Sequence, residues 1–163
     1  MNKNVVLLLM VFTSCRPNDN FDAELASLLK GDVPFIYTAS LENEIKDQDL
    51  LLFDARSFEE YQVSHLPGAV FIGYSFFLKG KVGGYDKNKK VVVYCSVGYR
   101  SEKIGRILQK MGFSHVRNLY GGVFDWKNRG NAVVNKKGEE TDSVHTYNKK
   151  WSRWLKNGIK VYE

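Results

Sequence analysis

The sequence predicts an α/β domain in which helices cover both faces of a parallel sheet. Short apolar runs rich in β-branched and aromatic residues, such as residues 91–94, are typical of buried strands. These runs alternate with segments whose apolar residues recur at helical spacing, such as residues 101–111. Ligands bind parallel sheets of this kind at the carboxyl ends of the strands. The residues that follow each predicted strand are therefore the first candidates for a functional site.

The composition is that of one globular domain with a small excess of positive charge. The chain has 163 residues, of which 44% are hydrophobic, and a formal net charge of +6. Lysines and arginines are spread along the chain without a nucleic-acid-binding motif, so we expect attraction of small anions and no nucleic acid partner. The 2 cysteines, Cys15 and Cys95, are isolated from the 3 histidines, which argues against a zinc site. No metal is predicted.

The first residues have the pattern of an export signal. A basic start at residues 1–4 precedes an apolar run at 5–12, which is too short to cross a bilayer, where a helix needs ~20 residues. Small residues before Cys15 resemble the cleavage box of bacterial lipoproteins, so residues 1–14 are predicted to be a signal peptide and Cys15 the lipidated residue. We expect an exported, membrane-anchored lipoprotein that faces the periplasm or the cell exterior. A cleaved signal without lipid and a retained cytosolic N-terminus are the alternatives.

Residues 15–33 are predicted to form a tether and a packing helix. Phe21, Leu25, Leu28 and Leu29 keep helical spacing, and Gly31 ends the pattern. The elements that follow are a strand at 35–37, a helix at 41–45 capped by Ser40, and a buried strand at 50–53 that ends at Asp54.

A turn and a long loop precede the central strand. Ser57 and Glu60 have the spacing of a capping box, which favours a capping role for Glu60 over acid or base chemistry. His65 lies before a Pro-Gly turn into a strand at 70–72, and we expect it to support the fold. Residues 73–88 are predicted to be a loop near the site, whose aromatic side chains either shape an acceptor pocket or pack in the core.

The segment around Cys95 combines a strand end, a glycine and a helix start. Cys95 follows the strand at 91–94, and Ser101 is the predicted N-cap of a helix that Gly112 ends. Free cysteine has a pKa of ~8.5, and a helix N-terminus with a nearby arginine such as Arg100 lowers it. Gly98 lets backbone N–H groups converge on an anion. Cys95 is therefore the candidate nucleophile, although a lone buried cysteine is more often a small core residue.

The last third of the chain is predicted to finish the sheet and then extend beyond it. A strand at 116–119 is followed by a tight turn at 120–122 and a helix that Gly130 ends. In residues 131–163, an amphipathic helix is expected from four apolar side chains at i, i+4, i+7 and i+8, namely Tyr147, Trp151, Trp154 and Leu155. We expect this helix to dock onto the domain, with contact to a membrane surface as the alternative.

Three motifs between residues 34 and 130 resemble a rhodanese (sulfurtransferase) domain. They are the segment from Asp-x-Arg to His-x-Pro-Gly-Ala at 54–69, the Cys-x-x-Gly-x-Arg-Ser loop at 95–101, and the Tyr-Gly-Gly turn at 120–122. The resemblance implies a three-layer fold with Cys95 as the catalytic residue. It also implies that the rest of the loop binds the substrate, through Ser96, Val97, Gly98, Tyr99, Arg100 and Ser101. Asp54, Arg56 and His65 are implied to support the site.

The family's chemistry gives the predicted function. A Cys95 thiolate takes a sulfur atom from a small anionic donor such as thiosulfate and passes the resulting persulfide sulfur to cyanide, a thiol or a protein acceptor, without a cofactor. The first alternative is a phosphatase or arsenate reductase of the same fold. The active loops of those enzymes resemble Cys-x5-Arg, whereas Cys95 and Arg100 have the shorter Cys-x4-Arg spacing. The second alternative is a noncatalytic binding or sensing module, or a persulfide carrier for a partner protein.

Overall fold

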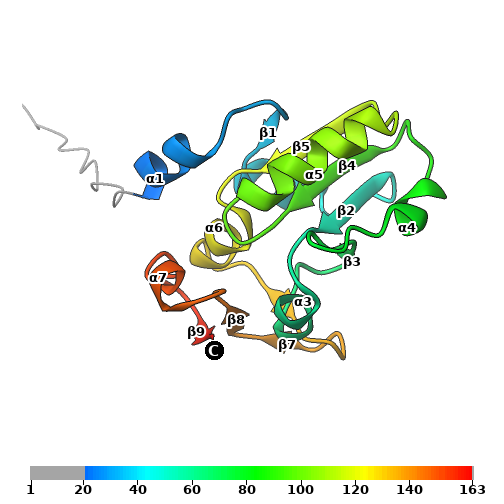
Figure 1. Ribbon diagram of the computed structural model, residues 1–163. Helices are drawn as coiled ribbons and strands as arrows, with labels where there is room; N and C mark the ends of the chain where they lie inside the picture. Colours follow the sequence, from blue (N-terminus) through cyan, green and yellow to red (C-terminus); the bar gives the residue numbers. More distant parts are fainter. Residues whose placement is uncertain (1–20, 163) are drawn as a thin grey trace, which may run out of the picture.

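The computed structural model describes residues 21–162, and its centre is a five-stranded parallel sheet (Figure 1). In chain order the strands are β1 (Phe35–Ile36), β2 (Leu50–Asp54), β3 (Val70–Phe71), β4 (Lys90–Tyr94) and β5 (His115–Leu119). Their spatial order is β1-β5-β4-β2-β3, and every neighbouring pair is parallel. The predicted parallel α/β sheet is confirmed.

Helices pack against both faces of this sheet and make three layers. Residues of α1 (Phe21–Leu28), α2 (Thr38–Glu44) and α6 (Gly122–Asn128) share one hydrophobic core, and residues of α4 (Lys79–Gly83) and α5 (Tyr99–Lys110) share the other. Figure 1 shows α5 lying across one face of the sheet. The helix α3 (Phe58–Val63) joins β2 to β3.

The alternation of side chains along β4 explains why both faces are covered. Val91 and Val93 belong to the core beneath α5, while Val92 and Tyr94 belong to the opposite core, and all four are fully buried. Successive side chains of a strand point to opposite faces, so an apolar run needs a layer on each side. The run therefore places Cys95 at the carboxyl end of a fully enclosed central strand.

Two segments before Cys95 differ from the sequence prediction. The helix predicted at 41–45 begins earlier, because α2 spans Thr38–Glu44 with Tyr37 as its N-cap, so Ser40 lies inside the helix. The segment at 73–88 is not a continuous loop, since it contains α4. Both segments contain too few apolar residues at helical spacing to define the helix from the sequence. The position of each helix is set by tertiary packing, since Leu41 lies in one core and Val82 in the other.

The C-terminal residues form two small sheets and a single helical turn. β6 (Val133–Val134) pairs with β7 (Glu140–Thr141), and β8 (Ser143–His145) pairs with β9 (Ile159–Val161) around α7 (Lys149–Ser152). The predicted long amphipathic helix is therefore wrong. The Asn148 side chain caps Trp151 N–H and starts α7 after Tyr147, whose φ of 66° is not helical.

The C-terminal segment nevertheless docks onto the domain as predicted. Trp154 and Leu155 are buried and belong to the same core as Leu25 of α1, and the Trp154 ring packs on Phe21 at 5.1 Å between centroids. Their burial explains the apolar spacing in the sequence. Of the four residues in the predicted period, Trp154 and Leu155 become buried, and turns rather than one helix bring them inward.

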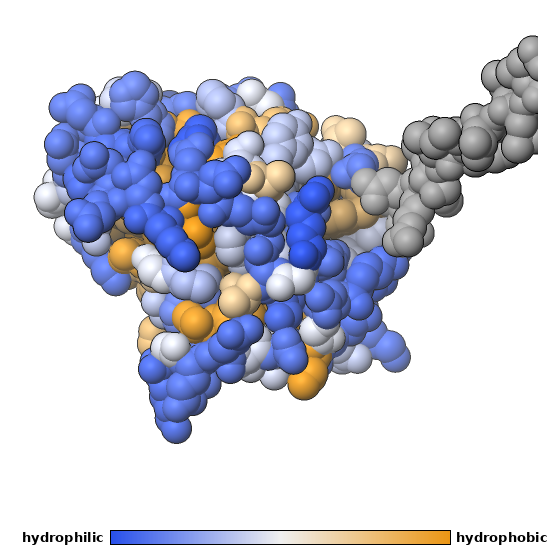
Figure 2. Space-filling model, turned by 180° about the vertical axis from the view of Figure 1, so that it is seen from behind, coloured by the Kyte–Doolittle hydropathy of each residue, from blue (hydrophilic) through white to orange (hydrophobic). Residues whose placement is uncertain are grey.

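One outer face of the described residues is mostly hydrophilic. On the face opposite to the view of Figure 1, hydrophilic residues predominate and apolar residues occur in separate spots (Figure 2). Within residues 21–162, no helix has both the length and the apolar character needed to cross a membrane. The predicted signal peptide at 1–14 and the predicted lipidation site Cys15 lie outside the described residues.

Candidate active site

The candidate nucleophile lies where β4 meets the loop that leads to α5. Cys95 follows Tyr94 directly, and Tyr94 is paired in register with Asp54 at the end of β2. The thiol is a free cysteine that is 1% exposed. The first turn of α6 binds this loop through two hydrogen bonds. Val123 N–H donates to the Cys95 carbonyl at 2.9 Å, and Phe124 N–H donates to the Ser96 carbonyl at 3.2 Å.

A glycine makes this contact between loop and helix possible. Gly122 has a φ of 55°, and a Cβ at this position would lie 2.3 Å from the Cys95 carbonyl oxygen. Any side chain would therefore push the Cys95 loop off the first turn of α6. The Tyr-Gly-Gly turn of the sequence is thus part of the active-site support.

The surroundings of the sulfur favour a thiolate. Gly98 N–H donates to the Cys95 Sγ at 3.1 Å, with Gly98 itself at a φ of 109°. Burial alone would raise the pKa of the thiol, but the Arg100 charge and hydrogen bonds from Ser101 and the Val97 N–H outweigh it, so the pKa lies below its ordinary value. The predicted convergence of N–H groups on the sulfur is present.

Ser101 does not cap the helix, contrary to the sequence prediction. The N-cap of α5 is Gly98, and Ser101 is fully buried inside the first turn. Its hydroxyl donates to Asn118 Oδ1 at 2.7 Å, and Asn118 Nδ2 donates to the Gly98 carbonyl at 3.0 Å. Tight loop geometry lets the helix begin without a side-chain cap, and the serine instead ties the loop to β5.

Arg100 is joined to Glu60 by a two-armed ion pair. Nη1 and Nη2 of Arg100 donate to the two carboxylate oxygens of Glu60 at 2.7 Å each, and Nη2 also donates to Ser96 Oγ at 2.9 Å. Burial opposes ionisation of Glu60, but Arg100 lowers its pKa to about 2. The predicted capping box is confirmed as well, because Glu60 accepts from Ser57 N–H while Ser57 Oγ accepts from Glu60 N–H.

Asp54 and Arg56 form a second ion pair beneath the site. Both side chains are completely buried, and Arg56 Nη2 donates to Asp54 Oδ2 at 2.7 Å and to the Ser64 carbonyl. Burial alone would lower the pKa of the guanidinium, but the Asp54 carboxylate raises it. Neither residue lines the pocket at Cys95, so Arg56 is not placed to bind a substrate anion there.

His65 supports the fold, which was the interpretation preferred from the sequence. Its backbone pairs with Val134, its Nδ1 lies 3.0 Å from the Tyr61 carbonyl oxygen, and its ring stacks on Tyr61 at 3.9 Å between centroids. The histidine also does not line the pocket at Cys95. It links α3 to the small sheet at the start of the C-terminal extension.

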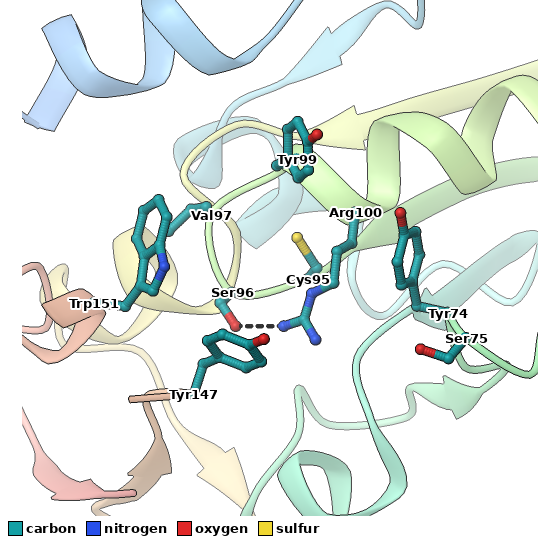
Figure 3. A pocket seen from close by; sticks show the side chains of 9 residues that line it. All are labelled: Tyr74, Ser75, Cys95, Ser96, Val97, Tyr99, Arg100, Tyr147 and Trp151. Carbon is teal, nitrogen blue, oxygen red and sulfur yellow. Dashed lines mark hydrogen bonds between the residues drawn. The ribbon is translucent and has the colours of Figure 1, made fainter. Parts of the chain in front are cut away.

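A pocket of about 350 Å³ opens at the Cys95 sulfur (Figure 3). Its wall is formed by three groups of residues that are distant in sequence, namely Cys95, Ser96, Val97, Tyr99 and Arg100 of the loop, Tyr74 and Ser75 of the 73–78 segment, and Tyr147 and Trp151 of the C-terminal extension. Figure 3 shows Tyr147 and Trp151 on one side of Cys95, with Tyr74 and Ser75 on the other. The predicted loop near the site does contribute aromatic lining.

Sequence reasoning missed three contributors to this site. Glu60 was recognised as a cap, but nothing local indicates its partner Arg100, 40 positions away. Tyr147 and Trp151 were assigned to a docking helix, and only the docking was correct. The signals available in the sequence were the aromatic residues themselves and the Asn148 cap.

The described residues offer no metal centre. Between residues 21 and 162, no group of three or more His, Cys, Asp or Glu side chains is arranged to hold a metal ion. The arrangement that is present combines a thiol of lowered pKa, backbone N–H donors and a paired arginine at the mouth of a pocket. Such a site is suited to nucleophilic attack by sulfur.

Comparison with known families agrees with the fold and the motifs. The model of the Rhodanese-like domain matches residues 38–129, which is more than half of the chain. The matched segment includes the Cys95 loop, the Asp54–Arg56 turn and the Gly121–Gly122 turn. The residues of the C-terminal extension that line the pocket lie beyond it.

The chain spans about half or less of the length of the relatives described here. The "Putative sulfur carrier protein YrkF" of Bacillus subtilis is 32% identical over 95 residues, which are 58% of this chain and 51% of the relative. A tRNA uridine(34) hydroxylase of Buchnera aphidicola is 28% identical over 119 residues, 70% of this chain and 38% of the relative. The structure of a thiosulfate sulfurtransferase from Pseudomonas aeruginosa is similar in fold, with a TM-score of 0.60 and 21% identity. The match covers 74% of this chain and 24% of that protein.

Proposed function

Since the chain belongs to the rhodanese-like domain family, we propose that it is a sulfurtransferase that carries a sulfur atom as a persulfide on Cys95. The observation that carries the proposal is the Cys95 thiol itself, whose pKa is lowered and which lies at the floor of a pocket beside Arg100. Thiosulfate is the model donor, and cyanide or a thiol is the acceptor. The similarity to a protein named as a sulfur carrier supports the same chemistry.

The reaction has two halves that balance without a cofactor. In the first, the Cys95 thiolate attacks the outer sulfur of thiosulfate, a new S–S bond forms, and the S–S bond of thiosulfate breaks with its electron pair leaving on sulfite. In the second, the acceptor attacks the outer sulfur of the persulfide and the Cys95 thiolate returns. A ping-pong rate law follows from this exchange.

The loop and Arg100 supply the electrostatic support for both halves. The N–H of Gly98 donates to Sγ in the free protein, and N–H donors of the same loop hold the negatively charged persulfide in the proposal. Arg100 keeps a positive charge next to the sulfur because Glu60 fixes its position. Thiolate and persulfide carry the same charge, so one arrangement stabilises both.

Two other functions remain as alternatives within this site. A persulfide carrier for a partner protein uses the same Cys95 chemistry and differs only in its acceptor. A phosphatase or arsenate reductase requires a loop that surrounds a tetrahedral anion, and the Cys-x4-Arg spacing with Arg100 held by Glu60 favours sulfur transfer.

Release of sulfite without an acceptor tests the proposal. When excess thiosulfate is added to the reduced protein, we expect a burst of one sulfite per Cys95, followed by continuous thiocyanate formation once cyanide is added. Cys95→Ala should release none. Sulfite release that Cys95→Ala retains, or the absence of a burst from the folded parent protein, would overturn the assignment and direct attention to phosphate esters.

We also propose that residues 1–14 are an export signal and that Cys15 anchors the protein to a membrane. The support is the sequence pattern of a basic start, an apolar run and small residues before a cysteine. The full chain expressed in bacteria should incorporate an alkyne-labelled fatty acid and sediment with membranes, whereas Cys15→Ser should remain unlabelled. Unlabelled parent protein in the cytosolic fraction would contradict the proposal.

A further inference from the structure

The pocket at Cys95 is larger and more aromatic than a small inorganic donor requires. Its volume of about 350 Å³ lies in the range of pockets that bind organic molecules, roughly 300–1,000 Å³. Four of its lining residues are aromatic, namely Tyr74, Tyr99, Tyr147 and Trp151. Thiosulfate has no apolar surface to place against them.

The charges around the pocket are largely compensated. Arg100 is paired with both oxygens of Glu60, and Arg56 is buried in a pair with Asp54. Each arginine therefore brings a neighbouring carboxylate, whereas Lys103, whose ammonium lies 4.2 Å from the centre of the Tyr99 ring, adds one further positive charge beside the pocket. This arrangement suits a substrate with one negative charge better than the dianion thiosulfate.

The C-terminal extension builds one wall of the pocket with a strained residue. Tyr147 is the one non-glycine residue with a positive φ among residues 21–162. Its N–H donates to His145 Nδ1 at 3.1 Å, and its ring lies 5.5 Å from the Arg100 guanidinium carbon. Strained conformations of this kind are retained where the surrounding structure enforces them, and they cluster at functional sites.

The neighbouring elements fix the position of this wall. β8 ends at His145, and Asn148 caps the helix that carries Trp151, so both aromatic residues are attached to short ordered elements. The Tyr147 side chain remains 56% exposed, although Trp154 and Leu155 close by are buried. A tyrosine that served packing alone would be covered by the core, whereas the Tyr147 side chain lies beside Ser96 and Arg100 in the wall of the pocket (Figure 3).

We propose that Tyr147 and Trp151 select organic sulfur donors that carry a flat apolar group and a single negative charge. This inference rests on the proposed sulfur transfer and names its substrate class. In the first half-reaction the Cys95 thiolate attacks the terminal sulfur of R–SO2–S⁻, an S–S bond forms, and the sulfinate R–SO2⁻ leaves with the electron pair of the broken bond. The flat group R lies against the two aromatic side chains.

The test compares benzenethiosulfonate with methanethiosulfonate, two monoanions that differ in R. Values of kcat/KM for the donor are measured with cyanide as acceptor and divided by each donor's rate with free cysteine, which removes the difference in leaving group. We expect the parent protein to prefer the benzene compound by about tenfold, the size of one or two aromatic contacts. Tyr147→Ala should lower this preference severalfold, because the benzene compound loses its contact with the ring and its kcat/KM falls more than that of the methane compound.

Tyr37→Ala is the matched control, because Tyr37 is 55% exposed, close to Tyr147, but lies outside the Cys95 pocket. It should leave the preference unchanged. Trp151→Phe is a second variant in which the preference between the two donors is measured, because it keeps an aromatic ring and the fold. Equal corrected rates for both donors in the parent, or an equal loss for both donors in Tyr147→Ala, would overturn the selection and leave sulfur transfer intact. Failure of every donor, thiosulfate included, to place sulfur on Cys95 would overturn the proposed function and this inference together.

Discussion

Two arginine–carboxylate pairs lie close to the active loop, and they differ in what surrounds them. Arg56 and Asp54 are two positions apart, and both side chains are 0% exposed. Arg100 and Glu60 are 40 positions apart, and the arginine keeps 18% exposure at the wall of the pocket. Each arginine also lies over a tyrosine ring, buried Tyr94 for Arg56 and exposed Tyr147 for Arg100.

The comparison separates a pair that serves the fold from one that serves the thiol. Arg56 joins the end of β2 to the Ser64 carbonyl after α3, and its Nη1 has no hydrogen-bond partner in the described part of the chain. Arg100 joins α3 to the Cys95 loop and lowers the pKa of the thiol. Similar chemistry thus has different consequences, because one pair is enclosed by protein and the other borders the pocket.

The largest effect is expected when the enclosed pair is broken. Arg56→Met leaves the Asp54 carboxylate buried without its counter-charge, which typically costs about 3–5 kcal/mol. Urea unfolding of the variant should show a loss of this size, with soluble protein still reacting at Cys95 in proportion to its folded fraction. A loss below about 1 kcal/mol would mean that the pair is not a principal support of the fold.

The Glu60 pair should make stability depend on acid pH. The pKa of Glu60 is about 2 in the folded protein against an ordinary 4.5, so its stabilisation is complete above pH 4.5 and is lost as the pH falls toward 2. The shift corresponds to about 3 kcal/mol. The difference in unfolding free energy between the parent protein and Glu60→Gln should shrink over this range. A difference independent of pH would show that Glu60 is not held as a carboxylate by Arg100.

Removing Arg100 should raise the pKa of the Cys95 thiol and also leave the buried Glu60 carboxylate without its partner. Arg100→Gln takes away the charge that lowers the Cys95 pKa, so the thiolate fraction falls and alkylation by iodoacetamide at pH 7 should slow severalfold. Arg106→Gln is the control, since Arg106 lies on the same helix and pairs with Asp32 instead. Equal alkylation rates in the parent protein and Arg100→Gln would show that Arg100 does not lower the pKa of the Cys95 thiol.

The smallest effect concerns the two tyrosines beneath these arginines. Tyr94→Phe leaves the buried Leu66 N–H without its acceptor at 3.1 Å and removes a hydrogen bond to Asp54, which should cost about 1–2 kcal/mol. Tyr147→Phe removes a hydroxyl from a half-exposed ring and should change stability by less than about 0.5 kcal/mol. Thermal unfolding of both variants checks the ordering, and equal losses would contradict the contrast drawn between the two pairs.

The sequence predicted the central sheet because its information is local. The apolar run of β4, the capping box at Ser57 and the glycine that ends α5 each depend on residues within a few positions. The strand end, Gly98 and the helix start made Cys95 the candidate nucleophile, and the resemblance to a known family supported that prediction. These features required no knowledge of which strands are neighbours.

The parts of the site that escaped prediction depend on distant partners. The ion pair of Glu60 with Arg100 exists because β2 and β4 are adjacent in the sheet, an order that propensities do not encode. Ser101 has the residue type of a cap, but burial and Asn118 gave it another role. The spacing of Tyr147, Trp151 and Trp154 fits a helix, whereas a left-handed residue and a side-chain cap divide the segment.

Sulfur transfer through Cys95 requires that this residue hold a sulfur atom, and intact mass measures that addition. The reduced domain and its Cys95→Ala variant are treated with thiosulfate, desalted and weighed before and after addition of cyanide. We expect a gain of one sulfur atom on the parent protein alone, removed by cyanide with release of thiocyanate. A folded, reduced parent protein that gains no sulfur, or a gain that Cys95→Ala shares, would contradict it.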